Sequence, residues 1–407
     1  MVLEGVATAP RSLRDLLRSP FPAASAERRL PCGLIVAIAM VLALGGCAGS
    51  GAQHSPDGQS RTLAPESAHR IILHVDRLQA DEPAANFVSF AWAMGSETAL
   101  PTLLSGPIRV RPGFGEALVG ANIDLPEGAS AAVDIRVFKD RTGFISPWLR
   151  LAAWGDGVPP AHAAATREFS DAASGLSGKV DVDCFESSCC FDALEYRITA
   201  STADAHIRCV SVVLTDTRAW VGRNPAWRPR NAITLEVPFR SQRTPDPTLS
   251  GRLCSPTSVA MVLAYRGVDV PVIDVARRTY EPMDDLYGNW PHNVQAAHTF
   301  GASASLARFD RWEDVERVLA SGQPIIASIA AGLGELRGAP YPKTGGHLIV
   351  LRGMAESGDV LVNDPSVSTA ALGQLIYRRE DLTNVWMHRT HGTAYIIKPH
   401  EHPTPTN

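Results

Sequence analysis

The chain has 407 residues, of which 45% are hydrophobic and 20% are charged. This composition is that of a globular protein, and the length favours two domains with separate cores. The formal net charge of −4 lacks the strongly basic character of most nucleic-acid-binding domains, so no nucleic-acid partner is expected.

The first 46 residues predict an export signal. Arg28 and Arg29 precede an apolar run over 33–46, which is too short to span a membrane comfortably. Residues 44–47 resemble the lipobox of bacterial lipoproteins, in which the signal is cut before a cysteine that then carries lipid. We therefore expect 1–46 to be the leader, Cys47 to be lipidated, and the protein to be an extracytoplasmic, membrane-anchored bacterial lipoprotein. An ordinary signal peptide is the alternative.

Residues 47–67 are rich in Gly, Ser, Gln, Pro and Asp and are typical of a flexible tether. Over 68–222 the pattern is short and alternating, with no competing helix-length periodicity. Strands are expected at 69–75, 130–140, 177–185, 193–200 and 206–216, which predicts an N-terminal all-β sandwich. Trp148 and Trp154 belong either to its core or to a surface that stacks on a ligand such as a glycan or cell-wall polymer.

Four cysteines of this β-rich region, Cys184, Cys189, Cys190 and Cys209, are disulfide candidates in an exported protein. Three complete pairings are open, and the adjacent Cys189 and Cys190 are expected to pair with different partners. A zinc site is the alternative, although the tight ligand spacing of such sites is missing. Cys254 is left as a single thiol.

Residues 223–232 form a proline-marked linker, and the pattern changes over 233–400. A strand at 233–242, helices at 255–267 and 309–322, a strand at 323–332 and a hairpin over 347–365 predict an α+β domain, followed by a tail at 401–407. Asp310 and Glu313 have the spacing of a capping box for the second helix. His388 and His391 are expected in an exposed loop.

Cys254 lies at the predicted start of a helix, where the exposed N–H groups and the positive end of the dipole favour a thiolate. The alternative is a packed thiol, since free cysteines are often buried. His347 begins a predicted strand after two glycines and is the best candidate for a partner base.

The predicted hairpin supplies a carboxylate for His347. If the loop 354–357 places Gly353 opposite Gly358, antiparallel register places His347 opposite Asp364. Asn363 is the rival orienting residue, but a one-residue shift turns its side chain to the other face of the sheet.

An oxyanion formed by thiolate attack needs hydrogen-bond donors. Gln242 is a candidate, and an exposed loop glutamine is the alternative. Four segments occur in order: VPFRSQ (237–242), CSPTSVAMVL (254–263), GGHLIVLRG (345–353) and VLVNDPS (360–366). Together they resemble the C39-like family of papain-fold cysteine peptidases over about 235–400. The resemblance implies Cys254 as nucleophile, His347 as general base and acid, Asp364 as orienting residue and Gln242 as oxyanion donor, with no metal or organic cofactor.

The expected function is hydrolysis of an amide bond in a peptide or protein substrate through a Cys-His-Asp triad. Two alternatives remain open at this stage. One is a catalytically idle surface protein whose sandwich binds a polymer, and the other is an acyl transferase that uses the same thiol.

Overall fold

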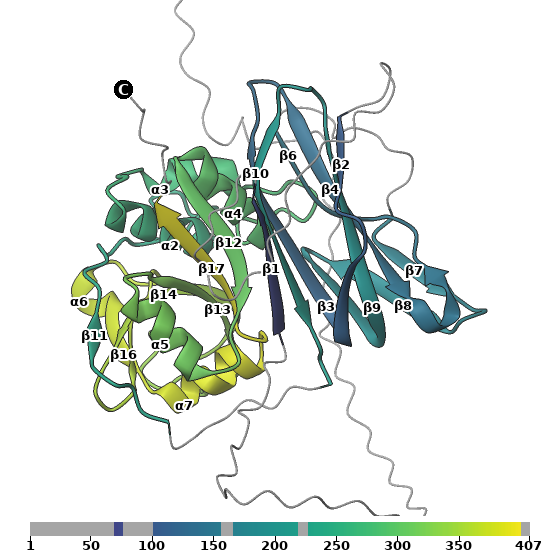
Figure 1. The fold of residues 1–407 in the computed structure, drawn as a ribbon. Coiled ribbons are helices and arrows are strands. Elements are labelled where there is room, and N and C mark those ends of the chain that lie inside the picture. Colours follow the sequence, from purple (N-terminus) through teal and green to yellow (C-terminus); the bar gives the residue numbers. More distant parts are fainter. Residues whose placement is uncertain (1–68, 76–100, 156–165, 219–226, 400–407) are drawn as a thin grey trace, which may run out of the picture. The chain divides into compact units, whose positions relative to one another are not determined.

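The computed structural model describes residues 69–75, 101–155, 166–218 and 227–399, and for 69–75 the backbone alone. They belong to one compact unit, Ala64–Asn407 (Figure 1). The predicted leader, the predicted lipidation site at Cys47 and the predicted tail at 401–407 lie outside the described residues, as does the predicted tether.

Ten of the described strands form one antiparallel sheet. Six lie side by side in the order β1 (His69–Val75), β10 (His206–Thr215), β3 (Ile108–Asp124), β9 (Cys184–Ala200), β4 (Ser130–Lys139) and β5 (Phe144–Ile145), the last two joined through η1 (Asp140–Thr142). The others are β2 (Thr102–Leu104) on β9, β6 (Leu149–Gly155) on β4, and β7 (Glu168–Asp171) on β8 (Leu176–Asp181), which itself pairs with β9. The strand expected at 177–185 is divided by a turn at Val182, whose φ is 57°.

This sheet curves around a single hydrophobic core. Side chains of β3 and β10 share the core with those of β4 and β6, although these pairs of strands are not neighbours in the sheet. The all-β class of this region is therefore as the sequence indicates. Because its strands form one hydrogen-bonded network, a sandwich of two separate sheets stays a prediction.

The two candidate tryptophans have different environments. Trp154 is 6% exposed and belongs to the core. Trp148 is half-buried, and the guanidinium groups of Arg136 and Arg197 lie 4.6 and 4.4 Å from the ring centre. Since two cations already cover this ring, it offers little surface for stacking on a polymer.

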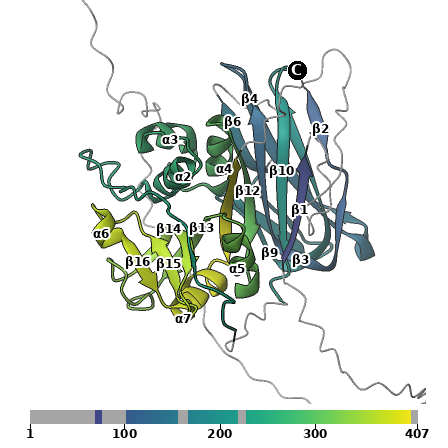
Figure 2. The same ribbon diagram turned by 60° about the vertical axis from the view of Figure 1, so that its left-hand side comes forward.

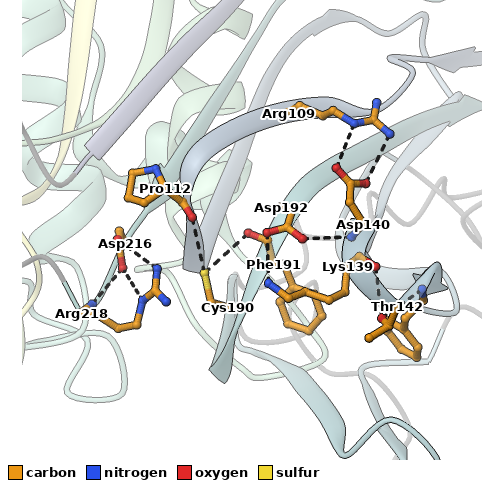
Figure 3. Close-up of polar contacts among 11 residues, drawn as sticks. Arg109, Pro112, Lys139, Asp140, Thr142, Cys190, Phe191, Asp192, Asp216 and Arg218 are labelled. Atoms are coloured by element: carbon orange, nitrogen blue, oxygen red, sulfur yellow. Dashed lines mark hydrogen bonds and ion pairs between the residues drawn. The ribbon is translucent and has the colours of Figure 1, made fainter. Parts of the chain in front are cut away.

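The disulfide prediction is wrong, because none of Cys184, Cys189, Cys190 and Cys209 forms a disulfide in the structure. Three of them lie on β9, where consecutive side chains point to opposite faces, and Cys209 lies on β10, with β3 between the two strands. Strands two apart are separated by roughly 10 Å, beyond the roughly 7 Å limit between Cα atoms for a disulfide. Figure 3 shows the Cys190 thiol between two backbone carbonyl groups, both 3.9 Å away.

No group of three or more His, Cys, Asp or Glu side chains within the described ranges is arranged to hold a metal ion.

The second sheet has the strand order β12 (Ala302–Arg308), β17 (Thr393–Pro399), β13 (Ile325–Ala331), β14 (Thr344–Met354), β15 (Val360–Asn363) and β16 (Gln374–Tyr377), with β11 (Ile233–Thr234) on β14. Its helices are α2 (Cys254–Tyr265), α3 (Val272–Thr279), α4 (Trp290–Thr299), α5 (Trp312–Ala320), α6 (Ala370–Gly373), α7 (Arg379–Leu382) and the π-helical turn η2 (Thr383–His388) (Figure 2). Within the described part of the chain, no helix has the length and apolar character needed to cross a bilayer.

Alternation along the strands divides this sheet between two cores. Ile326 and Val350 join the core formed with α2 and α4, whereas Ile325 and Leu351 join the core formed with α5 and η2. Helices thus cover both faces of an antiparallel sheet, which confirms the α+β class of this region.

Two local predictions in this region are wrong. The strand expected at 233–242 forms a ladder only at Ile233–Thr234, with one further backbone bond from the Leu235 N–H to the Arg352 carbonyl at 2.7 Å. Further along, Pro238 has no N–H to donate to a ladder. The capping box is absent, because α5 begins at Trp312, with Arg311 instead of Asp310 at the N-cap and no side-chain capping bond.

Two buried carboxamides join the two sheets. Asn122 of β3 donates to the Ala304 carbonyl and accepts from the Ala304 N–H, both at 2.9 Å. Gln295 of α4 makes the same double contact with the backbone of Ile123, at 2.7 and 2.8 Å. Each carboxamide thus replaces a peptide group across the contact and satisfies backbone groups that would otherwise be buried unpaired.

A buried ion pair lies in the same contact. Arg308 of β12 donates to the Glu116 carboxylate at 2.6 Å and to the hydroxyl groups of Thr215 and Thr393 at 2.8 and 3.0 Å. His391 also lies 2.8 Å from Glu116 through Nδ1 and is half-buried, so its expected place in an exposed loop is wrong.

This ion pair makes the protein sensitive to acid. Burial alone would raise the pKa of Glu116, but His391 and Arg308 hold it at about 2. A carboxyl group whose pKa falls on folding stabilises the protein above its ordinary pKa of 4.5 and loses this contribution as the pH falls towards 2. Glu116→Gln is expected to remove about 3 kcal/mol of the difference in unfolding free energy between pH 6 and pH 2. Urea titrations at both pH values measure it, and an unchanged difference in the variant would contradict the expectation.

Candidate active site

Cys254 is the first residue of α2, as its position in the sequence indicates, and its side chain is half-buried. The start of this helix is fixed by two buried hydroxyl groups. Ser255 Oγ lies 3.1 Å from the hydroxyl of Tyr395 on β17, and Ser258 Oγ donates to the Leu348 carbonyl of β14 at 3.3 Å. These contacts hold the helix start against the centre of the second sheet.

His347 immediately precedes Leu348 on β14 and is 5% exposed. Its imidazole lies close enough to the Cys254 thiol for each group to shift the pKa of the other. Burial alone would raise the pKa of the Cys254 thiol, but the bond to His347 and the charge of the ring bring that pKa below its usual value. Burial alone would lower the pKa of His347, but its bonds to Asp364 and Cys254 raise it to about 10. The charges therefore favour a thiolate beside an imidazolium.

Asp364 meets His347 by a route different from the predicted one. The hairpin predicted from the sequence has Gly353 opposite Gly358, but Gly353 pairs with Leu361 because the turn is longer, and a register shift lies between Leu351 and Gly353. β15 consequently ends before Asp364. From the loop beyond the strand, Asp364 Oδ1 lies 2.9 Å from His347 Nε2.

The structure separates the two candidate orienting residues. Asn363 is fully buried, and its Nδ2 donates to the Val237 carbonyl at 2.9 Å and lies 3.7 Å from the sulfur of Met261. Its side chain is therefore engaged away from His347, and the neighbouring Asp364 makes that contact.

Asp364 is fully buried and accepts four hydrogen bonds. Oδ1 accepts from His347 and from the N–H of Ser366, and Oδ2 accepts from the hydroxyl groups of Tyr341 and Tyr377. Burial alone would raise the pKa of Asp364, but its donors, foremost His347, bring that pKa far below its usual value. Neither tyrosine could be found from the sequence, because no spacing pattern connects either position with residue 364.

Gln242 is close to the same loop. Its backbone N–H donates to the Pro365 carbonyl at 2.9 Å, and its side chain is 7% exposed. The Oε1 atom is buried and finds no hydrogen-bond partner among the described residues. The alternative interpretation, an exposed loop glutamine, is therefore wrong, and the buried carboxamide oxygen has hydrogen-bonding capacity left.

A groove of about 630 Å³ lies elsewhere, beside β7, β8 and the start of β9. Glu116 and His391 line it together with residues of the first sheet, and none of the four candidate catalytic residues does.

A sequence model of the Peptidase_C39 like family matches residues 234–394. This segment belongs to the C39-like peptidase family. The match spans Gln242, Cys254, His347 and Asp364 and indicates a cysteine peptidase. The rest of the described chain, including the whole ten-stranded sheet, lies outside the C39-like segment.

Solved structures similar to this chain include a protein described as a C39-like peptidase from Bacillus anthracis, with 20% identity, a TM-score of 0.31, and coverage of 41% of this chain and 97% of that one. A double-glycine-motif protease from an AMS/PCAT transporter, solved with the leader peptide, has 23% identity, a TM-score of 0.29, and coverage of 42% and 99%. The peptidase domain of Streptococcus ComA has 16% identity, a TM-score of 0.28, and coverage of 40% and 99%. A search of curated proteins found no match.

Proposed function

We propose that the protein is a lipid-anchored, extracytoplasmic cysteine peptidase or amidase in which Cys254, His347 and Asp364 form the catalytic triad. The observation that carries the proposal is the buried chain of contacts from the Asp364 carboxylate through His347, at 2.9 Å, to the Cys254 thiol. The membership of residues 234–394 in the C39-like family supports it. In this proposal residues 233–400 form the catalytic domain, and 68–222 form a β-domain that is docked on it.

The reaction begins when the Cys254 thiolate attacks the carbonyl carbon of the substrate amide. The carbonyl π electrons move to the oxygen, and the oxyanion accepts hydrogen bonds from the Gln242 side-chain amide and the Cys254 N–H. The C–N bond then breaks, and the His347 imidazolium gives its proton to the leaving amine, which leaves a thioester on Cys254. Water attacks this thioester while His347 takes the proton, and the thiolate departs with the acid as product.

Asp364 supports each step without exchanging a proton. Its pKa lies far below the usual range, so the carboxylate stays charged and stabilises the imidazolium. The substrate class follows from this chemistry: an amide carbonyl in a peptide or protein is polar enough to be attacked and yields an amine that needs a proton. Product analysis with and without an added amine distinguishes hydrolysis from acyl transfer.

Selective alkylation tests the proposed nucleophile. At pH 6 iodoacetamide is expected to modify Cys254 at least about 10-fold faster than Cys190, because thiolates react and the Cys254 pKa is lowered while burial raises that of Cys190. Cys184, whose pKa burial also raises, is expected to react more slowly still. Peptide mapping by mass spectrometry measures the three rates.

The matched variant for this experiment is His347→Ala, which removes the hydrogen bond that lowers the Cys254 pKa. Its Cys254 is expected to lose the advantage in rate at pH 6 and to regain it only at higher pH. If Cys254 in the wild-type protein reacts no faster than Cys190, the proposed thiolate does not form.

A further inference from the structure

The Asp364 carboxylate binds more donors than a triad requires. Oδ1 accepts from His347 Nε2 at 2.9 Å and from the Ser366 N–H at 3.0 Å. Oδ2 accepts from the hydroxyl groups of Tyr341 and Tyr377 at 2.9 and 2.8 Å. Four donors on two oxygen atoms determine both the position of the carboxylate and the rotation of its plane.

The two tyrosines reach Asp364 from different elements. Tyr377 is the last residue of β16 and is fully buried. Tyr341 lies in the loop before β14 and is half-buried. Its ring also meets the His347 ring edge-on, with centroids 5.1 Å apart and planes at 73°. Tyr341 therefore contacts both partners of the His347–Asp364 pair.

The loop that carries Tyr341 is held by its own contacts. The Gly334 N–H donates to the Pro342 carbonyl at 3.0 Å, which closes the loop on itself. The Glu335 carboxylate accepts from the Gly332 N–H and from Arg389, both at 2.7 Å. Because these bonds tie the loop to its own base and to the segment after η2, the Tyr341 hydroxyl is in place without a ligand.

We infer that Tyr341 and Tyr377 are positioning residues that keep Asp364 Oδ1 on His347 Nε2, so that the other nitrogen of the ring faces the Cys254 thiol. The inference rests on the proposed function. A charged oxygen that is buried without donors is costly, so loss of both hydroxyl groups would turn the carboxylate towards its remaining donors, His347 and Ser366. The imidazole would move with it, and the alignment with the thiol would be lost.

The test compares Tyr341→Phe, Tyr377→Phe and the double variant, which remove only hydroxyl groups. We expect kcat to fall about 10-fold for each single variant and about 100-fold for the double variant, with KM within about twofold, because the hydroxyl groups act on the chemical step. Tyr265→Phe is the matched control: its hydroxyl donates to the Gly322 carbonyl at 3.4 Å, and kcat is expected to be unchanged.

The same substitutions in an Asp364→Ala background separate positioning from a general structural role. Tyrosines that act only through Asp364 have no further effect on the residual kcat once the carboxylate is gone, whereas a structural role would lower it again. A repeated loss in that background overturns the inference. A double tyrosine variant with kcat within twofold of the wild type also overturns it.

The outcomes separate this inference from the proposed function. Hydrolysis that survives Cys254→Ala overturns the function itself. A dead Cys254→Ala protein together with an unimpaired double tyrosine variant overturns the positioning role alone. Thermal melting checks the folding of each variant. If Tyr377→Phe lowers stability because Tyr377 is fully buried, kcat of Tyr341→Phe still tests the inference, since Tyr341 is only half-buried.

Discussion

Replacing Cys254 with alanine is expected to lower peptide hydrolysis at least about 10⁴-fold while the protein stays folded. The sulfur supplies the attacking electron pair, and no other described thiol contacts His347, so the variant has no substitute nucleophile. A 10⁴-fold loss corresponds to about 5 kcal/mol of transition-state stabilisation. The side chain is small and half-buried, which limits the cavity that alanine leaves. Initial rates on a peptide library, together with circular dichroism and thermal melting, measure both parts of this expectation.

Cys190→Ala is the matched control. This thiol is also half-buried, but it lies against the backbone carbonyl groups of Pro112 and Phe191 and beside the Arg218 side chain, so turnover is expected to equal that of the wild type (Figure 3). Residual turnover of a few per cent in Cys254→Ala would rule out the thiol as the nucleophile. Such a result would require a nucleophile other than the Cys254 thiol.

Replacing Arg308 with methionine is expected to destabilise the protein by about 3–5 kcal/mol. The Arg308 side chain is 2% exposed and the Glu116 carboxylate 14% exposed, so little water can replace the lost cation. Glu116 would keep its contact with His391 Nδ1. The hydrogen bonds from the guanidinium group to Glu116, Thr215 and Thr393 would be lost. Chemical denaturation at pH 7, monitored by tryptophan fluorescence, measures the change.

Two further variants interpret this result. Arg277→Met removes an exposed pair with Asp274 on α3 and is expected to cost less than about 1 kcal/mol. Glu116→Gln combined with Arg308→Met is expected to recover part of the loss, because it removes the unpaired buried charge. If Arg308→Met is as stable as the wild type, the ion pair does not hold the two sheets together.

The elements most visible in the sequence are those with strong local patterns. The strands at 69–75, 130–140 and 206–216 alternate, and the structure has β1, β4 and β10 at those places. α2 begins at Cys254 and ends before Gly267, as the prolines and glycines around it indicate. However, every residue of this helix from Ser255 to Leu263 is buried, because both α3 and the second sheet pack against it. The apolar face seen in the sequence predicted burial on one side only.

Features that depend on contacts between distant segments could not be predicted. The hairpin register was wrong because the turn covers 355–359, so that Gly353 pairs with Leu361, and a register shift between Leu351 and Gly353 then moves the pairing by one residue. A run of apolar residues encodes neither feature. The contact between His347 and Asp364 nevertheless exists, since Asp364 reaches back from a loop. The disulfide prediction rested on the number of cysteines, and the sequence does not show that β3 lies between β9 and β10.

The position of β12 predicts the solubility of a fragment that contains the second sheet without the first. β12 is the outermost strand of its sheet, and along its open side Asn122 and Ser211 of the other sheet bind the backbone of Ala304 and Leu306. A fragment cut at the proposed linker would expose these backbone groups together with the apolar side chains beside them. Uncovered edge strands pair readily with other chains, so recombinant catalytic domain produced alone should aggregate, and soluble preparations should need the preceding β-domain in the same polypeptide.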